Sequence, residues 1–230
     1  MAEPSNPDAT ADPVYRAAAI DLLAVVAYGE LSAFERLVHD ARMATRLADR
    51  IALERMAADQ FAAVEPLLER ITELGADPLE ALAPFEGAFD TFHSATAPST
   101  FVEGLVKAFV GDALAADFYR EIAALLDEDT RRIVGQSLDR HGQTDFIIGR
   151  VREAITDDPK ILGPLALWAR RLMGEALAQA QHVAVDRDAL MGLLTNSGAG
   201  PSLDLAALGG MFARITELHK ARMAALGLEP

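Results

Sequence analysis

The chain has 230 residues, of which 51% are apolar and 24% charged, and it carries a formal net charge of −14. This composition is enough to bury one large core, and the negative charge disfavours nucleic acid as a partner, because phosphate chains are repelled. The absence of cysteine excludes disulfides, thiolate zinc sites and a cysteine nucleophile.

No membrane segment is expected. The longest apolar runs, such as Ala17–Ala27, are interrupted by Asp21 and are too short to span a bilayer. The first residues also lack the basic and apolar regions of a signal peptide. We therefore expect a cytoplasmic protein.

The first half of the chain predicts a tail, two long helices and a connection. Residues 1–12 are rich in Pro and Asn and form the expected disordered tail. Helices are predicted over 13–46 and 48–74, the second ending at Gly75 as a left-handed cap. Residues 77–99 hold three prolines and predict a long crossover with one short helix at 79–89.

The second half predicts two further long helices and two additional ones. A helix over 99–126 is followed by another that starts after the acidic residues 127–129 and ends near 157–159. A fifth helix is expected over 160–185, a loop at 196–201 and a last amphipathic helix over 203–225. Residues 13–230 are thus predicted to form a single all-α domain, a four-helix bundle with a long crossover and extra C-terminal helices.

Two of the predicted helices contain a similar short sequence motif. Tyr28-Gly29-Glu30 and Val110-Gly111-Asp112 lie 82 residues apart, since 112 − 30 = 82, and each places one acid among apolar neighbours at helical spacing. Both acids should face inward, where an ionised carboxylate needs a cation, a proton or several donors. The alternative is that the helices are rotated and both acids meet water at the edge of the apolar stripe.

The chain resembles the ferritin-like superfamily, and within it the tRNA 2-methylthio-isopentenyladenosine hydroxylases. The resemblance spans roughly residues 15–185 and rests on short segments: Ala27-Tyr28-Gly29-Glu30-Leu31, Phe85, Asp90-Thr91-Phe92-His93, Val110-Gly111-Asp112, Asp117-Phe118-Tyr119-Arg120-Glu121 and the stretch 167–176 around Trp168. It implies a ferritin-like bundle with a non-haem di-iron centre held by two single carboxylates and two Glu-x-x-His pairs.

The ligands implied by the resemblance are incomplete in this chain. Glu30 and Asp112 match the single carboxylates, but the Glu-x-x-His pairs fall on Gln60-Phe61-Ala62-Ala63 and Arg140-His141-Gly142-Gln143. An amide and a cation therefore stand where acids are expected. No cofactor is predicted, and the alternative is a di-iron or di-manganese site with an unusual ligand set.

Arg140 offers an explanation for two inward-facing acids. A guanidinium has five donors and can bridge two carboxylates, so we expect a Glu30–Arg140–Asp112 network completed by Gln60 and Gln143. Tyr28 and Trp168 are expected at a ligand cavity, although core packing is the simpler role for Trp168.

These observations favour a ferritin-like, hydroxylase-related protein that has lost its di-iron site. It is expected to act by protein interaction or by binding a small apolar ligand, and to associate as a homodimer. The alternative is an active di-metal oxygenase or tRNA hydroxylase.

Overall fold

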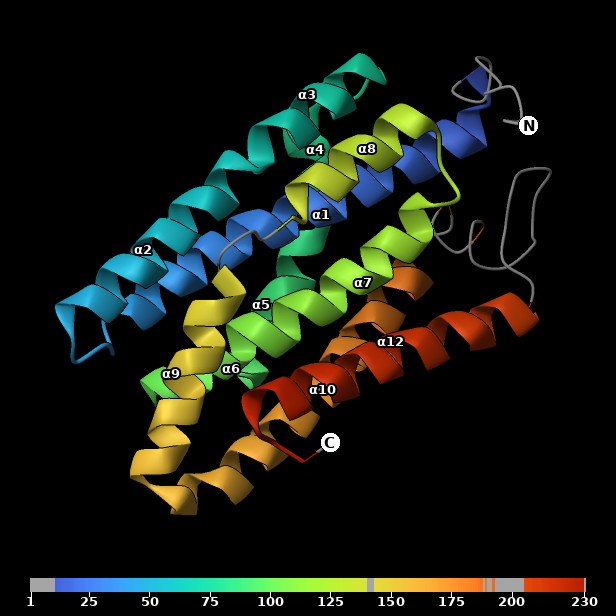
Figure 1. The fold of residues 1–230 in the computed structure, drawn as a ribbon. Helices are drawn as coiled ribbons and strands as arrows, with labels where there is room; N and C mark the ends of the chain where they lie inside the picture. The colour runs from blue at the N-terminus through green and yellow to red at the C-terminus, as the bar shows by residue number, and fades with distance from the viewer. Residues whose placement is uncertain (1–10, 140–142, 188, 190–191, 193–204, 230) are drawn as a thin grey trace.

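A computed structural model describes residues 11–139, 143–187, 189, 192 and 205–229. Every regular element in these ranges is a helix, and the helices lie side by side as a bundle (Figure 1). The predicted all-α class with additional C-terminal helices is confirmed. The first ten residues of the predicted tail and the predicted loop at 196–201 lie outside the described residues.

The first pair of the bundle is formed by α1 (Pro13–Ala41) and the helices α2 (Leu47–Ala62) and α3 (Val64–Glu73). The second predicted helix is interrupted at Ala63, because Pro66 has no N–H to donate to the carbonyl four residues earlier. Gly75 has a φ of +87°, so its predicted role as a left-handed cap is confirmed.

The crossover contains more helix than predicted. It comprises α4 (Pro78–Leu82), the 3₁₀ turn η2 (Ala83–Phe85) and α5 (Glu86–Ala95). Asp77 starts it by accepting hydrogen bonds from the backbone N–H groups of Leu79 and Glu80 at 2.8 and 3.1 Å. The later part of the crossover, α5, packs against α1 and α10.

The second pair starts with α6 (Phe101–Val106), the π-helical turn η3 (Lys107–Gly111) and α7 (Asp112–Ala123). It continues with α8 (Glu128–Ser137) and α9 (Gln143–Asp157). Two differences from the predicted helices are therefore found: a π turn within the third and a break within the fourth. Isolated π turns in α-helices are frequent at functional sites.

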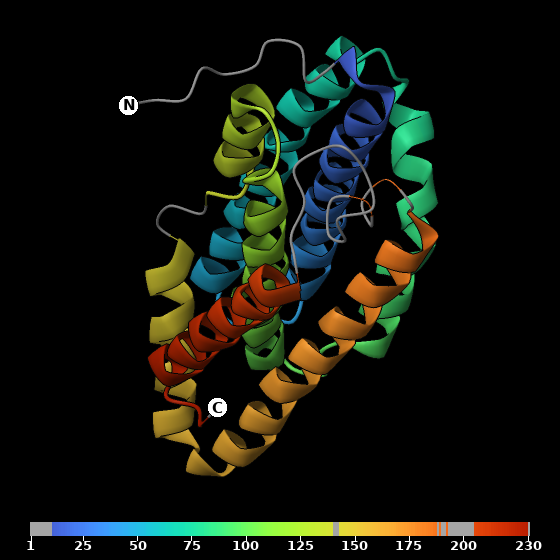
Figure 2. The same cartoon turned by 90° about the vertical axis from the view of Figure 1, so that its right-hand side faces the viewer.

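The C-terminal helices cover one side of the bundle. The 3₁₀ turn η4 (Pro159–Ile161) leads into α10 (Leu162–Asp186), and α12 (Leu205–Leu226) crosses α7 and α9 (Figures 1 and 2). Asp117 of α7 binds Arg222 of α12 through two hydrogen bonds of 2.6 and 2.9 Å. Both side chains are largely buried, at 19% exposure for Arg222 and 7% for Asp117, and this bidentate pair fixes α12 against α7.

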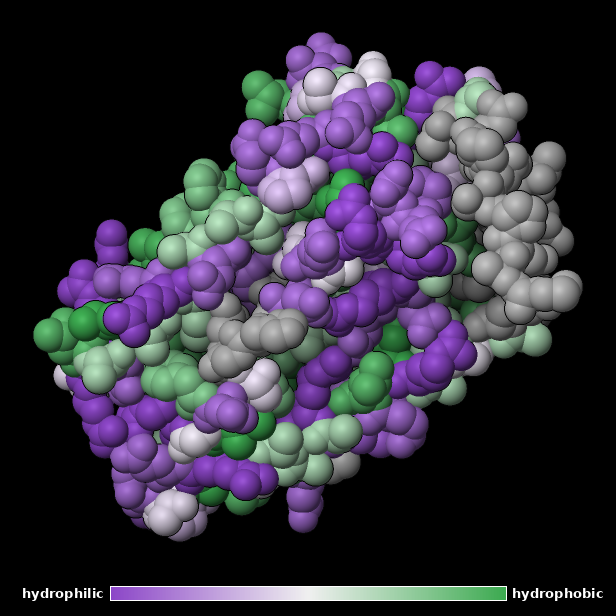
Figure 3. Space-filling view, turned by 45° about the horizontal axis from the view of Figure 1, so that its top comes forward, coloured by the Kyte–Doolittle hydropathy of each residue, from purple (hydrophilic) through white to green (hydrophobic). Residues whose placement is uncertain are grey.

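The helix α1 lies at the centre of the core. It is the one described helix that is long and apolar enough to cross a membrane, and 67% of its most apolar window is buried inside the protein. Asp21, which interrupts its apolar run, forms an ion pair with Arg187. On the face drawn in Figure 3, hydrophobic residues are interleaved with hydrophilic ones.

Candidate functional site

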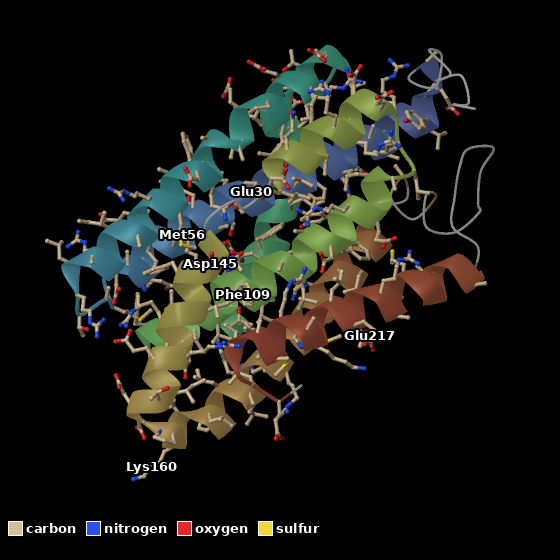
Figure 4. The ribbon with its side chains drawn as sticks, viewed as in Figure 1. Glu30, Met56, Phe109, Asp145, Lys160 and Glu217 are labelled. Carbon is tan, nitrogen blue, oxygen red and sulfur yellow. The ribbon has the colours of Figure 1, made fainter. Side chains whose placement is uncertain are left out.

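The two acids singled out by the sequence line the same cavity. Glu30 is 2% exposed and lies inside the bundle (Figure 4). Asp112 is the first residue of α7, directly after the π turn. The cavity has a volume of about 150 Å³, is partly open to the surface, and lies between α1, α5, α7 and α10. The prediction that both acids face inward therefore agrees with the structure.

The cation that binds Asp112 is Arg36. Its Nη2 lies 2.7 Å from Oδ2 of Asp112, and its Nη1 lies 3.4 Å from Oδ2 of Asp40. Arg140, the predicted bridge, lies outside the described residues. Arg36 is not among the site residues predicted from the sequence, since it falls on none of the metal-ligand positions. Its spacing places it on the same helix face as the buried Ala33, three residues before it, and the buried Asp40, four residues after it, but does not identify Asp112 as its partner.

A second cation, Lys107, is buried beside this ion pair. Its side chain is 1% exposed, and its Nζ donates a hydrogen bond to the carbonyl of Thr96 at 2.8 Å. Burial lowers the pKa of Lys107 to about 7, an effect that Arg36 increases and the two nearby aspartates oppose. Lys107 is the first residue of the π turn, and Asp112 follows its last residue. The turn therefore orients the side chains of both Lys107 and Asp112 towards the core.

Asp40 of α1 packs closely against Gly104 of α6, the first helix of the second pair. It is 1% exposed, and burial raises the pKa of its carboxyl group, against the opposing effects of Arg36 and Lys107. A Cβ atom at Gly104 would lie 3.1 Å from Oδ2 of Asp40. Glycine at this position therefore permits α6 to pack against the Asp40 carboxylate.

Two further polar side chains that were not predicted from the sequence to do so line the cavity, those of His93 and Tyr119. Burial lowers the pKa of His93 to about 3, an effect that Lys107 and Arg36 increase, and Nδ1 of His93 has no hydrogen-bond partner among the described residues. Burial raises the pKa of Tyr119, as do the charges of Glu30 and Asp112. Both side chains are consequently neutral near pH 7. The short helix predicted in the crossover ends at residue 89, and it is helix α5, which continues to Ala95, that brings His93 to the cavity.

Gln60 lies at a second cavity, which Asp112 also lines. It is 3% exposed, and its Nε2 has no hydrogen-bond partner among the described residues. This second cavity has a volume of about 230 Å³ and is lined by Asp112, Arg120 and Arg222 as well as by apolar residues. The side chain of Gln143 lies outside the described part of the chain. The predicted network of Gln60 with Arg140 and Gln143 therefore stays a prediction.

The expected cavity residues Tyr28 and Trp168 do not line the 150 Å³ cavity. The ring of Tyr28 packs against Phe89 at a centroid distance of 5.3 Å. The indole of Trp168 donates a hydrogen bond to the carbonyl of Glu103 at 3.1 Å and packs among apolar residues. Both rings are thus engaged by neighbouring helices, and Trp168 has the packing role named as the simpler one.

The described residues do not fit a di-metal centre. Among them, no three acidic or histidine side chains lie close enough together to hold a metal ion. Asp112 is bonded to the guanidinium of Arg36, which carries a permanent positive charge, and Gln60 contributes an amide where the resemblance implies an acid. Carboxylate and imidazole donors are what iron and manganese require, and too few are present here.

Comparisons with known proteins agree with the bundle. Among solved structures, a protein from Synechococcus described as having aldehyde deformylating oxidase activity matches with a TM-score of 0.71 and 20% identity, over 96% of this chain and 94% of that one. At this identity the match shows a shared fold. No curated protein matches the sequence. The sequence model of a family described as ferritin-like domain, actinomycetes, matches residues 13–197. The chain belongs to this ferritin-like family.

Proposed function

We propose that this ferritin-like protein has no di-metal centre and that it binds a small apolar molecule in the 150 Å³ cavity. The observation that carries the proposal is the ion pair between Arg36 and Asp112, with an N–O distance of 2.7 Å inside the bundle. Because of this ion pair, Asp112, one of the two carboxylates expected to bind metal, is bound to a permanent cation of the protein itself.

Electrostatics supports the absence of the metal. Arg36 places a permanent cation next to Asp40 and Asp112, and Lys107 adds a second positive charge when it is protonated, so the protein itself supplies counter-charges for these acids. A divalent cation at Asp112 would have to displace Arg36, and breaking a buried ion pair costs about 3–5 kcal/mol. It would then meet the remaining positive charge at close range.

The size and lining of the cavity support a small apolar ligand. Its walls are mainly apolar, formed by residues such as Leu22, Phe89 and Met173. An engineered apolar cavity of about 150 Å³ in another protein is known to bind benzene. The present cavity, also about 150 Å³, therefore suits a molecule of one aromatic ring. The oxidase activity named for the Synechococcus protein is not carried over, because a match at 20% identity shows the fold alone.

Thermal stabilisation by toluene tests the proposal. A ligand that binds only the folded state raises the melting temperature, so toluene should stabilise the wild type. Ala176→Leu would fill the cavity from α10, since Ala176 lines it, and should abolish the stabilisation. Ala178→Leu is the matched control: it adds the same side chain to the same helix at a residue that does not line the cavity. An unstabilised wild type, or equal stabilisation of both variants, would refute ligand binding at this site.

A further inference from the structure

His93, which lines the cavity, has a buried ring nitrogen that no described residue satisfies. Nδ1 of His93 is buried and has no hydrogen-bond partner among the described residues, while the imidazole packs beside Phe89 and Phe92 at ring-centroid distances of 6.4 and 5.3 Å. An unsatisfied buried polar atom is costly. Its retention in a mainly apolar cavity therefore points to a ligand that supplies the missing partner.

The charges around His93 restrict the head group of that ligand. Lys107 and Arg36 lie close enough to disfavour a positive charge on the imidazole. The same two cations disfavour an ammonium group that would hydrogen-bond to this imidazole. Glu30 lines the cavity and disfavours a carboxylate there, and Arg36 offers it no free partner because Arg36 is already paired with Asp112. The favoured head group is therefore neutral.

The chemistry of a neutral imidazole selects a hydroxyl group among the neutral choices. One ring nitrogen carries a hydrogen and the other accepts one, depending on the tautomer. A carbonyl group can only accept, whereas a hydroxyl group both donates and accepts. It consequently complements Nδ1 of His93 in either tautomer.

Resting on the proposed apolar-ligand function, we propose that the cavity selects small neutral alcohols or phenols, whose hydroxyl group hydrogen-bonds to Nδ1 of His93. His93 is thus the residue that determines head-group specificity. The aromatic and aliphatic walls hold the hydrocarbon part, and Glu30 disfavours the corresponding carboxylates.

A matched series of ligands tests this selection. Calorimetric dissociation constants would be measured near pH 7 for toluene, benzyl alcohol, benzylamine and benzoate with the wild type, His93→Leu and His219→Leu. His219 is the matched control, because it is also a buried histidine with an unpartnered Nδ1 among the described residues, but it lies on α12 and lines neither cavity.

The wild type should bind benzyl alcohol more tightly than benzoate or benzylamine. His93→Leu should reduce the affinity for benzyl alcohol relative to toluene by about 3- to 10-fold, the range expected for one hydrogen bond. His219→Leu should leave this ratio unchanged. If toluene and benzyl alcohol both fail to bind, the proposed function itself is wrong. If toluene binds but His93→Leu does not change the ratio, or benzoate or benzylamine binds as tightly as benzyl alcohol, the selection by His93 is refuted and the apolar cavity stands.

Discussion

Replacing Arg36 by methionine removes the charge that joins α1 to α7 and keeps much of the apolar volume of the side chain. In the structure the Arg36 side chain is 6% exposed, and its partners Asp40 and Asp112 are 1% and 14% exposed. Loss of one partner from a buried ion pair leaves an uncompensated charge and costs about 3–5 kcal/mol. At about 2–4 °C per kcal/mol for a chain of this size, the melting temperature should fall by about 6–20 °C.

Urea unfolding followed by circular dichroism measures this loss, and its pH dependence tests the cause. Burial already raises the pKa of Asp40 from 3.8, and Arg36 is the largest effect that opposes the rise. In Arg36→Met this pKa should rise further, so the folded state binds protons above pH 3.8 that the unfolded state has released. The destabilisation should therefore be largest near pH 7 and shrink as the pH falls towards 4.

The control is Arg50→Met, which removes an exposed partner of Glu54 on α2. This variant should lose less than about 1 kcal/mol and show no comparable pH dependence. A loss from Arg36→Met that is as small as that of the control, or that is independent of pH, would refute the argument that Arg36 neutralises buried acids.

Three further predictions concern single side chains. His93→Leu should raise the free energy of unfolding by about 1 kcal/mol, because it removes an unsatisfied buried polar group. The pKa of His93 in the folded state is about 3, below the usual 6.5, so the wild type should lose stability as the pH falls below 6.5. In pH-dependent melting curves the variant should lose less stability over this range than the wild type. Gly104→Ala should destabilise by about 1–3 kcal/mol in urea unfolding, because its Cβ would lie 3.1 Å from the Asp40 carboxylate, whereas Gly135→Ala in α8, with nothing within 4 Å, should stabilise by up to about 1 kcal/mol. Asp117→Asn should weaken the bidentate contact with Arg222 and increase hydrogen exchange along α12; unchanged exchange would show that this pair does not hold the helix.

The sequence predicted the helices and the inward direction of the two acids because these depend on local spacing. Glu30 is surrounded by apolar residues three and four positions away, so its side chain lies on an apolar face of its helix and is expected to be buried. Gly75 was recognised for a similar reason, since a left-handed cap depends on one residue type. Both features can be predicted without knowing which helices are neighbours.

The partner of Asp112 could not be found in this way. Arg36 lies 76 residues away, and whether its guanidinium faces the core depends on how α1 packs against α7. The π turn from Lys107 to Gly111 also changes the helical register just before Asp112, which a regular period cannot anticipate. His93 was missed for a comparable reason, because its position depends on the crossover folding as helix α5.

Anaerobic titration with iron(II) followed by metal analysis tests most directly whether a protein cation has taken the place of a metal at Asp112. Gln60→Glu with Ala63→His restores one Glu-x-x-His pair, and adding Arg36→Leu frees Asp112. The wild type should retain iron far below one ion per chain, and the triple variant should retain more. Near-stoichiometric iron in the wild type, with the Arg36–Asp112 pair broken, would contradict the account.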